Sequence, residues 1–429
     1  MVSITCRVWV LAGLFFVGYS AWSLVLYREY QSTGYDLGIF EQAVRSYADG
    51  HWPTSDLKGP GFPLLGDHFS PVLAVLAPFY LLHRDASTLL VAQAFLLAVS
   101  VVPVTRLAVG VAGSSRGLVV GVAYGFSWGL LHAVRFDFHE ICFAVPLLAF
   151  GLERLVLRQW RAAVWWTLPL VLVKEDLPWT VVAVGLYLVL RRQHRLGLLV
   201  ALFGACVGLV LVLVVLPSVN PAGRYAYWST LHLSSSSVWV GLAVRLGTIV
   251  ALLAPSGFLA VRSPVVLVGL PSLALRFASG NPLYWGMGFH YNAVLMPVVF
   301  VAFVDVLRYR RRFLVPLCFV VTLGLAVAPL VEGNGQPSWT SRQDVVADRV
   351  LAAIPDGASV AASNRLAPHL TGRCRVVLFP WRPGGWGVAG LGCCCVAVGW
   401  VAGVHWGGGG SGAFVGWVGV SAGGVCRER

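Results

Sequence analysis

The acidic side chains of this 429-residue chain are few and occur in groups. None of its 18 Asp and Glu residues lies between Leu177 and Val304, whereas six lie between Asp36 and Asp85. An ionisable side chain in an apolar setting is costly, so each such group is a candidate for function. These groups are therefore the places where chemistry could occur.

The first two groups follow the first apolar run. In the sequence YDLGIFEQ, Asp36 and Glu41 fall on nearly the same face of a predicted helix. Asp36 could cap this helix with Glu41 solvated, or a carboxylate here could act as a general base or metal ligand. In GDHFSP, Asp67 and His68 precede a helix that begins with proline. They could be an N-cap and its neighbour, or one half of a metal or phosphate site.

Two further groups interrupt apolar runs. In RFDFHE, an extended backbone would point Asp137 and His139 the same way, and the segment has more ionisable groups than a solvated turn requires. Lys174, Glu175 and Asp176 lie within a long apolar stretch, where water is scarce. This triplet is either functional or a self-neutralised structural pair, and we favour function for both groups.

The fifth group, GFHYN, places His290 at the end of an apolar run, where a core histidine is as plausible as a ligand. The sequence contains no P-loop, dinucleotide fingerprint, HExxH or GxSxG motif. ATP-driven transport and serine hydrolysis therefore lack support, and group-transfer chemistry with little or no dependence on metal stays open.

The composition determines the class of protein that must position these groups. Hydrophobic residues make up 58% of the chain and charged residues 11%, whereas soluble domains carry about 25% charged residues. This balance excludes a soluble domain, a secreted disulfide scaffold, a disordered chain and a soluble nucleic-acid-binding protein. The sequence predicts a multi-pass, all-α membrane protein with about 9–12 transmembrane or re-entrant helices.

Arginine clusters predict the orientation of these helices. The first apolar run, 8–27, is expected to be a retained anchor rather than a cleaved signal peptide. Clusters at 106–116, 154–161, 191–195 and 308–312 should be cytoplasmic. Segments 28–70 and 135–140 then lie outside, provided that 69–83 does not cross the membrane. Only two of the 31 basic residues are lysines, which is typical of a GC-rich bacterial genome and indicates the bacterial plasma membrane.

One stretch does not fit simple counting. Arg161 and Arg191 flank 29 residues, too few for two crossings of about 20 residues each. Either two short helices form a re-entrant hairpin around the charged triplet, or one long helix carries three charges through the bilayer. Irregular backbone is tolerated against a water-filled cavity, so we favour the hairpin.

We therefore divide the chain into a transmembrane region, 1–331, and two C-terminal segments. Within the first, 28–86 forms an outer loop with a re-entrant helix. Residues 332–380 predict a truncated extracytoplasmic α/β segment, with a helix at 341–354 and strands at 358–363 and 375–379. The Gly-, Trp- and Cys-rich tail, 381–429, is expected to be a frameshift product or disordered, or else one poor extra helix.

Several motifs in order resemble those of one family. They are YDLGIFEQAV, LLGDHFSPVL, FDFHE, LVKEDL, NPLYWGMGFHYNAVLMP and DGASVAASNRLAPHLTGR. Over residues 10–380 or so, the chain is similar to bacterial predicted membrane proteins that share a domain of unknown function and resemble GT-C glycosyltransferases. The resemblance implies a GT-C-like fold, a polyprenyl-phosphate-linked sugar donor and catalysis on the extracytoplasmic face. In GT-C enzymes an acid in the first outer loop, soon after the first helix, is the usual catalytic or metal-binding residue, and Asp36 occupies that place.

The resemblance leads to a specific hypothesis. Asp36 would accept the proton of the acceptor hydroxyl, assisted by Glu41 or Asp67. Seven residues of the last four groups are assigned to substrate binding. They are Asp67, His68, Asp137, His139, Lys174, Glu175 and His290. No cofactor is certain, but Mg²⁺ or Mn²⁺ could be held by Asp67, Asp137 and Glu175, because hard cations prefer oxygen ligands. The expected partners are membrane lipids and the donor, with no nucleic acid.

Other classes of function stay open. Charges at broken helices also occur in transporters and lipid flippases. A non-catalytic protein that kept a GT-C-like fold is the third possibility, so enzymatic activity is uncertain from the sequence. For an active site, Asp36, Asp67, His68, His139, Glu175 and His290 should converge on one outward-facing cavity.

Overall fold

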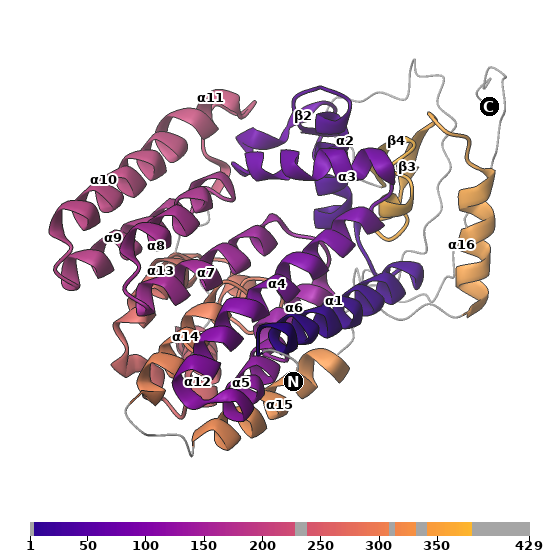
Figure 1. The fold of residues 1–429 in the computed structure, drawn as a ribbon. Helices are drawn as coiled ribbons and strands as arrows, with labels where there is room; N and C mark the ends of the chain where they lie inside the picture. The colour runs from indigo at the N-terminus through magenta and orange to yellow at the C-terminus, as the bar shows by residue number, and fades with distance from the viewer. Residues whose placement is uncertain (1–3, 228–237, 309–313, 332–340, 380–429) are drawn as a thin grey trace, which may run out of the picture. The chain divides into compact units, whose positions relative to one another are not determined.

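The computed structural model describes residues 4–227, 238–308, 314–331 and 341–379. Within these ranges the chain is mostly helical, with two small sheets of two strands each (Figure 1). The predicted tail, 381–429, lies outside the described residues.

The elements follow one another along the chain with short connections. The α-helices are α1 (Ile4–Arg28), α2 (Ile39–Ala48), α3 (Ala77–Leu82), α4 (Ser87–Ala112), α5 (Ser114–Gly125), α6 (Trp128–Phe136), α7 (Ala144–Val156), α8 (Trp160–Thr167), α9 (Pro178–Leu190), α10 (His194–Val210), α11 (Leu216–Val219), α12 (Val238–Leu253), α13 (Leu270–Ala278), α14 (Leu295–Leu307), α15 (Leu314–Val331) and α16 (Ser341–Ala353). The strands are β1 (Thr54–Ser55), β2 (Phe62–Pro63), β3 (Ser359–Ala362) and β4 (Arg375–Leu378).

The chain forms two compact units. The helical unit comprises the described parts of 1–24, 63–75 and 90–335. The α/β unit comprises 25–62 and 76–89 together with the described residues after 336. The predicted α/β segment at 332–380 thus shares its unit with two segments that come early in the sequence.

Six helices of the described residues are long and apolar enough to cross a membrane. They are Ile4–Arg28, Ser87–Ala112, Ser114–Phe136, His194–Val219, Trp239–Ser256 and Leu314–Val331. Four shorter apolar helices are Pro71–Leu82, Pro178–Leu190, Pro264–Ala278 and Leu295–Leu307. The predicted class, a polytopic helical membrane protein, is confirmed.

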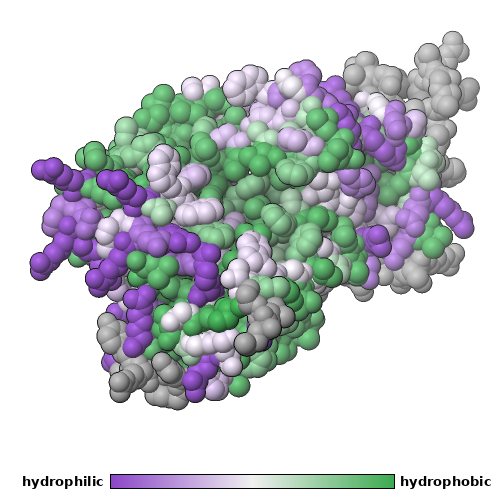
Figure 2. All heavy atoms as spheres, viewed as in Figure 1, coloured by the Kyte–Doolittle hydropathy of each residue, from purple (hydrophilic) through white to green (hydrophobic). Residues whose placement is uncertain are grey.

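The outer surface agrees with this class. Large apolar side chains are exposed along the long helices, including Leu14 on α1, Leu202 on α10 and Val320 on α15. In Figure 2, hydrophobic residues cover much of the face in view, and hydrophilic residues gather where α9 and α10 are joined. Such an apolar exterior is stable against lipid rather than water.

Helix α14 forms the centre of the helical unit. All of its residues except Asp305 are buried, and it packs against α7 and α12. A helix that is apolar on every side is stable only when it is enclosed by other helices or lipid. At 13 residues, α7 and α14 are each shorter than the roughly 20 residues of a full span.

Helices α9 and α10 form a closely packed antiparallel pair. A Cβ atom at Gly185 would lie 2.5 Å from the backbone nitrogen of Ala201, and one at Gly197 would lie 2.6 Å from the carbonyl oxygen of Gly185. Small residues let transmembrane helices approach this closely. The packing of α9 against α10 therefore fixes the position of Pro178, where α9 begins.

The segment with the charged triplet is broken, as the hairpin interpretation requires. Helix α8 continues as a 3₁₀ turn over Leu168–Leu172, and α9 begins at Pro178. Proline is favoured in the first helical turn, because its missing N–H would have no partner within the helix there. The triplet 174–176 therefore lies between two short helices, and the alternative of one long helix is wrong.

The α/β unit contains the predicted C-terminal elements. Strands β3 and β4 pair in parallel, with Ser359 opposite Arg375 and Ala362 opposite Leu378. Helix α16 precedes them in the chain, so the predicted helix and both strands are confirmed. Within this unit, Gly34 and Tyr35 donate backbone hydrogen bonds to Asn364, at 2.6 and 2.9 Å.

Candidate functional site

The helical unit contains a cavity of about 350 Å³ with a mixed lining. Its ionisable and aromatic lining residues are His68, His139, Lys174, Glu175, Asp176, Trp179, Tyr225, Tyr227, Arg276, Tyr284, His290 and Tyr291. Its aliphatic lining comes mainly from Ile141, Leu209, Val212, Leu213, Leu275 and Val294. The structure thus brings together five predicted site residues, namely His68, His139, Lys174, Glu175 and His290.

Buried amide side chains hold the two histidine segments. The Gln93 amide of α4 donates to the carbonyl oxygen of Asp137 at 2.6 Å and accepts from the backbone nitrogen of His139 at 3.0 Å. Asn220 donates to the carbonyl oxygen of Gly66 at 2.9 Å. Because an unpaired polar group would be costly here, these bonds fix the loops that carry His139 and His68.

Glu175 and His68 form the first charged pair in the cavity. His68 Nδ1 lies 2.8 Å from Oε1 of Glu175, and the backbone nitrogen of Phe69 donates to Oε2 at 3.2 Å. Tyr225 donates to Oε1 at 3.3 Å, and the Tyr227 hydroxyl lies 2.9 Å from Nε2 of His68. The carboxylate and both nitrogens of the imidazole are therefore fixed in orientation.

Glu140 holds the second charged cluster. Its Oε1 lies 3.0 Å from Nζ of Lys174, and its Oε2 lies 2.8 Å from Nδ1 of His139. Glu140 is fully buried. The His139 ring stacks on His290, with ring centroids 3.5 Å apart and an interplanar angle of 23°. One carboxylate thus orients both a lysine and a histidine that line the cavity.

Arg276 of α13 supplies another cation. Its guanidinium donates to the carbonyl oxygens of Tyr284 and Tyr291 and to Oδ1 of Asn292, the last at 2.8 Å. These three acceptors are uncharged, so they fix the position of the Arg276 guanidinium without neutralising its positive charge. A fixed arginine in a buried cavity is suited to bind an anionic oxygen.

Neighbouring charges shift the pKa values of this site. Burial and the Lys174 charge oppose protonation of His68, but Glu175 and Asp67 outweigh them and raise its pKa. For His290, burial and then the charges of His139 and Lys174 hold the pKa well below its usual range. The pKa values of these two histidines of one cavity are therefore shifted in opposite directions.

Other predicted residues lie elsewhere. Asp67 is buried beside this cluster, where the Tyr227 hydroxyl donates to it at 3.4 Å, but neither it nor Asp137 lines the cavity. Asp137 and His139 were expected to point the same way from an extended segment. His139 has extended backbone angles, a 3₁₀ helix begins only at Glu140, and Nδ1 of His139 lies 2.8 Å from Oε2 of Glu140.

Asp36 and Glu41 belong to the α/β unit. Asp36 has a positive φ of 68° in a π-helical turn, Gly34–Gly38. Glu41 is fully buried in its unit, where it accepts hydrogen bonds from Tyr80, at 2.9 Å, and from Thr371. These contacts give Glu41 a role in joining α2 to α3 and to the segment before β4.

The sequence did not single out Glu140, Arg276 or the two tyrosines as site residues. A signal existed for Arg276, because it is a lone charge in the apolar run 264–278, which marks it as a functional candidate. Glu140 directly follows His139 in FDFHE. Tyr225 and Tyr227 carry no comparable signal, since their role depends on hydrogen bonds to Glu175 and His68, which are distant in the sequence.

The predicted metal ligands do not fit a metal site. Within the described ranges, no group of three or more His, Cys, Asp or Glu side chains could hold a metal ion. Glu175 is engaged by His68 and Phe69, and Asp137 does not line the cavity. A Mg²⁺ or Mn²⁺ site formed by Asp67, Asp137 and Glu175 is therefore not supported by these residues.

This fold and cavity define a polytopic helical membrane protein with a buried cluster of ionisable groups. The model of the family described as predicted membrane protein (DUF2079) matches residues 26–383, and the chain belongs to this family. The predicted family membership is thus confirmed.

Comparison with known proteins gives two further findings. The chain is similar to the crystal structure of ArnT from Cupriavidus metallidurans in the apo state, with 16% sequence identity and a TM-score of 0.48. The match covers 84% of this chain and 85% of that chain. No curated protein matches the sequence.

Proposed function

We propose that this protein is an integral membrane glycosyltransferase that uses a polyprenyl-phosphate-linked sugar on the extracytoplasmic face. The observation that carries the proposal is the mixed lining of one cavity. Two cations, Lys174 and Arg276, share it with the aliphatic side chains of Leu209, Val212 and Leu213. An amphiphile that joins a phosphate to a polyprenyl chain matches both parts of this lining.

The chemistry is a displacement at the anomeric carbon. The acceptor hydroxyl oxygen forms a bond to this carbon, and the bond from the carbon to the phosphate oxygen breaks, so the phosphate leaves with the electron pair. Lys174 and Arg276 would stabilise the negative charge that develops on this oxygen. Glu140 would hold Lys174 and His139 in place without touching the substrate, because it does not line the cavity.

The proton of the acceptor hydroxyl needs a base. Asp36 keeps this role in the proposal because of its place after the first helix, which matches the catalytic acid in the family resemblance. Glu41 is fully enclosed within its own unit, so we give it no contact with substrate. The base and the phosphate-binding cations are tested by separate variants.

The test uses the purified full-length protein with a panel of polyprenyl-phosphate sugars and a cell-envelope extract as acceptor. Release of polyprenyl phosphate together with a glycosylated product supports the proposal. Lys174→Met should abolish this release, whereas Lys58→Met, which removes the other lysine, should leave it unchanged. Movement of the donor lipid across the membrane without any transfer product would favour the flippase alternative and overturn the proposal.

A further inference from the structure

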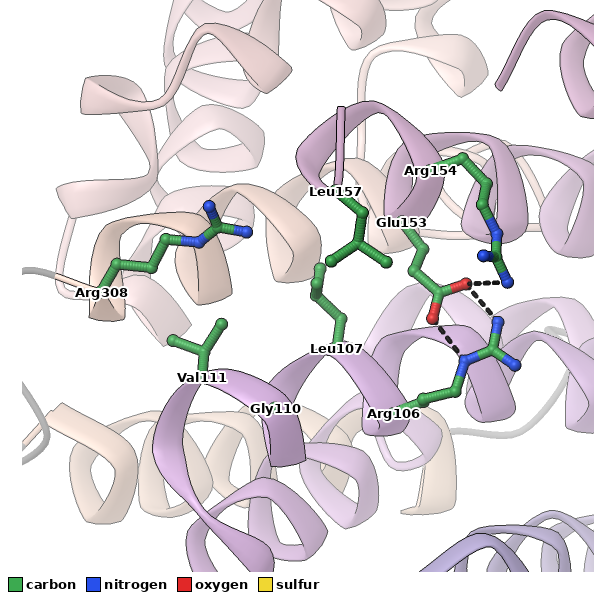
Figure 3. Close-up of a pocket in the computed structure, with 8 residues that line it drawn as sticks. All are labelled: Arg106, Leu107, Gly110, Val111, Glu153, Arg154, Leu157 and Arg308. Carbon is green, nitrogen blue, oxygen red and sulfur yellow. Dashed lines mark hydrogen bonds and ion pairs between the residues drawn. The ribbon is translucent and has the colours of Figure 1, made fainter. Parts of the chain in front are cut away.

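A second cavity, of about 640 Å³, lies in the helical unit away from the residues described above. Figure 3 shows it between α4, α7 and the end of α14. Three arginines line it, Arg106 of α4, Arg154 of α7 and Arg308 just after α14, together with Glu153. None of these residues belongs to the proposed catalytic cavity.

Glu153 fixes two of the arginines. Its carboxylate accepts two hydrogen bonds from the Arg106 guanidinium, one of them from Nε at 2.5 Å, and lies 3.5 Å from Nη2 of Arg154. The Glu153 side chain is 1% exposed, whereas that of Arg106 is 46% exposed. One carboxylate therefore holds two guanidiniums. Together these two guanidiniums have more N–H donors than the Glu153 carboxylate can accept hydrogen bonds from.

Arg308 lies across the cavity from this group (Figure 3). It donates to the carbonyl oxygen of Val156 at 3.3 Å and lies 3.6 Å from Asp305. Even with Asp305 counted, three guanidiniums face two carboxylates, so the site keeps a net positive charge. An anion is the ligand that such a site favours.

The rest of the lining is apolar and open. Leu107, Val111 and Leu157 contribute aliphatic side chains, and Leu157 is 44% exposed. A Cβ atom placed on Gly110 would meet nothing within 4 Å, so there is space above this glycine. A ligand that fits this cavity combines an anionic group with an apolar part.

We propose that this cavity binds the headgroup of an anionic phospholipid, with the phosphate between Arg106, Arg154 and Arg308. The apolar residues would then contact the glycerol and the first acyl carbons. Basic pockets between transmembrane helices on the cytoplasmic side bind such headgroups. The arginine clusters at 106–116, 154–161 and 308–312 predict that face for this cavity.

The test measures lipid binding by the purified full-length protein in detergent, independently of any enzymatic activity. Short-chain phosphatidylglycerol is titrated in, and phosphatidylcholine of the same chain length and inorganic phosphate serve as comparison ligands. Native mass spectrometry gives the bound fraction, and the rise in unfolding temperature gives a second readout. We expect phosphatidylglycerol to bind and both comparison ligands to bind much more weakly.

Two variants probe the cavity without leaving Glu153 unpaired. Gly110→Leu fills the open space and keeps every charge, so it should abolish retention of phosphatidylglycerol. Arg308→Gln should weaken binding about five-fold, the effect of one arginine near a membrane surface. Arg161→Gln removes the same charge from an exposed position outside the cavity and should change nothing.

The outcomes separate the alternatives. Loss of binding in Gly110→Leu with retention in Arg161→Gln supports the proposal. Equal weakening in Arg308→Gln and Arg161→Gln would show that binding reflects total charge, and the proposal would be wrong. Equal binding of inorganic phosphate would assign the cavity to a free phosphate and also overturn it. Unchanged binding in a correctly folded Gly110→Leu would place the lipid elsewhere.

Discussion

The Nζ atom of Lys174 lies 3.0 Å from Oε1 of Glu140, and the Glu140 side chain has no exposed surface. Removing one member of such a buried pair leaves the other charge unpaired, which is strongly destabilising, by about 3–5 kcal/mol. Removing both charges avoids this penalty. The pair therefore allows the roles of Lys174 in folding and in function to be separated.

We predict that Lys174→Met alone lowers both stability and activity, whereas Lys174→Met combined with Glu140→Gln regains much of the stability and stays inactive. The reason is that the double variant removes the unpaired carboxylate but does not restore the cation. Thermal unfolding in detergent and release of polyprenyl phosphate are measured in parallel. Recovery of activity in the double variant would show that Lys174 has only a structural role.

Asp36→Asn tests the proposed base. A general base contributes about 10²- to 10⁴-fold to rate and little to affinity. Asparagine tolerates the positive φ of 68° at this position, so the fold should be kept. We expect turnover to be lost while donor binding and the unfolding temperature stay nearly unchanged.

The exposed carboxylate of Asp49 gives a matched control. It pairs with Arg84 at 2.9 Å in the same unit, and Asp49→Asn should have little effect on turnover. Transfer activity that survives in Asp36→Asn would exclude Asp36 as the base.

Glu41 should make the α/β unit less stable as the pH rises from 4.5 to about 8. Burial raises its pKa to about 8, against the lowering effect of the Thr371 hydrogen bond. A carboxyl group with a raised folded-state pKa stabilises the fold fully below its unfolded pKa of 4.5, and this stability is lost as the pH rises to about 8. The loss amounts to about 1.4 kcal/mol per pH unit.

His369 of the same unit acts in the opposite direction below its unfolded pKa of 6.5. Burial lowers its pKa to about 4, so its contribution is present above 6.5 and is lost as the pH falls to about 4. The effects of Glu41 and His369 on the stability of the unit oppose each other between pH 4.5 and 6.5. Of these two residues, only Glu41 contributes to the pH dependence above 6.5.

We therefore predict that the free energy of local opening of α2 falls from pH 6.5 to 8. Amide hydrogen exchange, corrected for the intrinsic exchange rate, measures this free energy. In Glu41→Gln, the neutral amide mimics the protonated acid and this pH dependence should disappear. An identical pH profile in the variant would show that Glu41 does not titrate in this range.

Cysteine labelling tests the predicted topology. In a variant without native cysteines, single cysteines at the exposed positions His51 and Ser359 should react with an impermeant reagent in intact cells. A cysteine at Arg158, also exposed, should react only after the membrane is permeabilised. The reason is that arginine clusters are retained on the cytoplasmic side. The reverse pattern would invert the scheme and contradict the proposed extracytoplasmic position of the cavity.

The sequence by itself determined the class of this protein. Its low charge and long apolar runs require lipid as solvent, because a soluble fold could not cover its surface with so few charged residues. The break at Lys174 could be predicted as well, since 29 residues between arginines are too few for two full spans. The C-terminal helix and strands followed from local periodicity, which depends only on neighbouring residues.

Only the tertiary structure decided which ionisable groups meet. His68 and Glu175 are 107 residues apart, and Glu41 contacts Thr371 across 330 residues. No local pattern encodes such distances, because they depend on how the helices pack. A buried charge in apolar surroundings is stable only when it has an ion-pair or hydrogen-bond partner, and the packing of the helices determines which residue is that partner. Packing therefore placed Glu41 in a hydrogen-bonded core and made Glu140 and Arg276 part of the site.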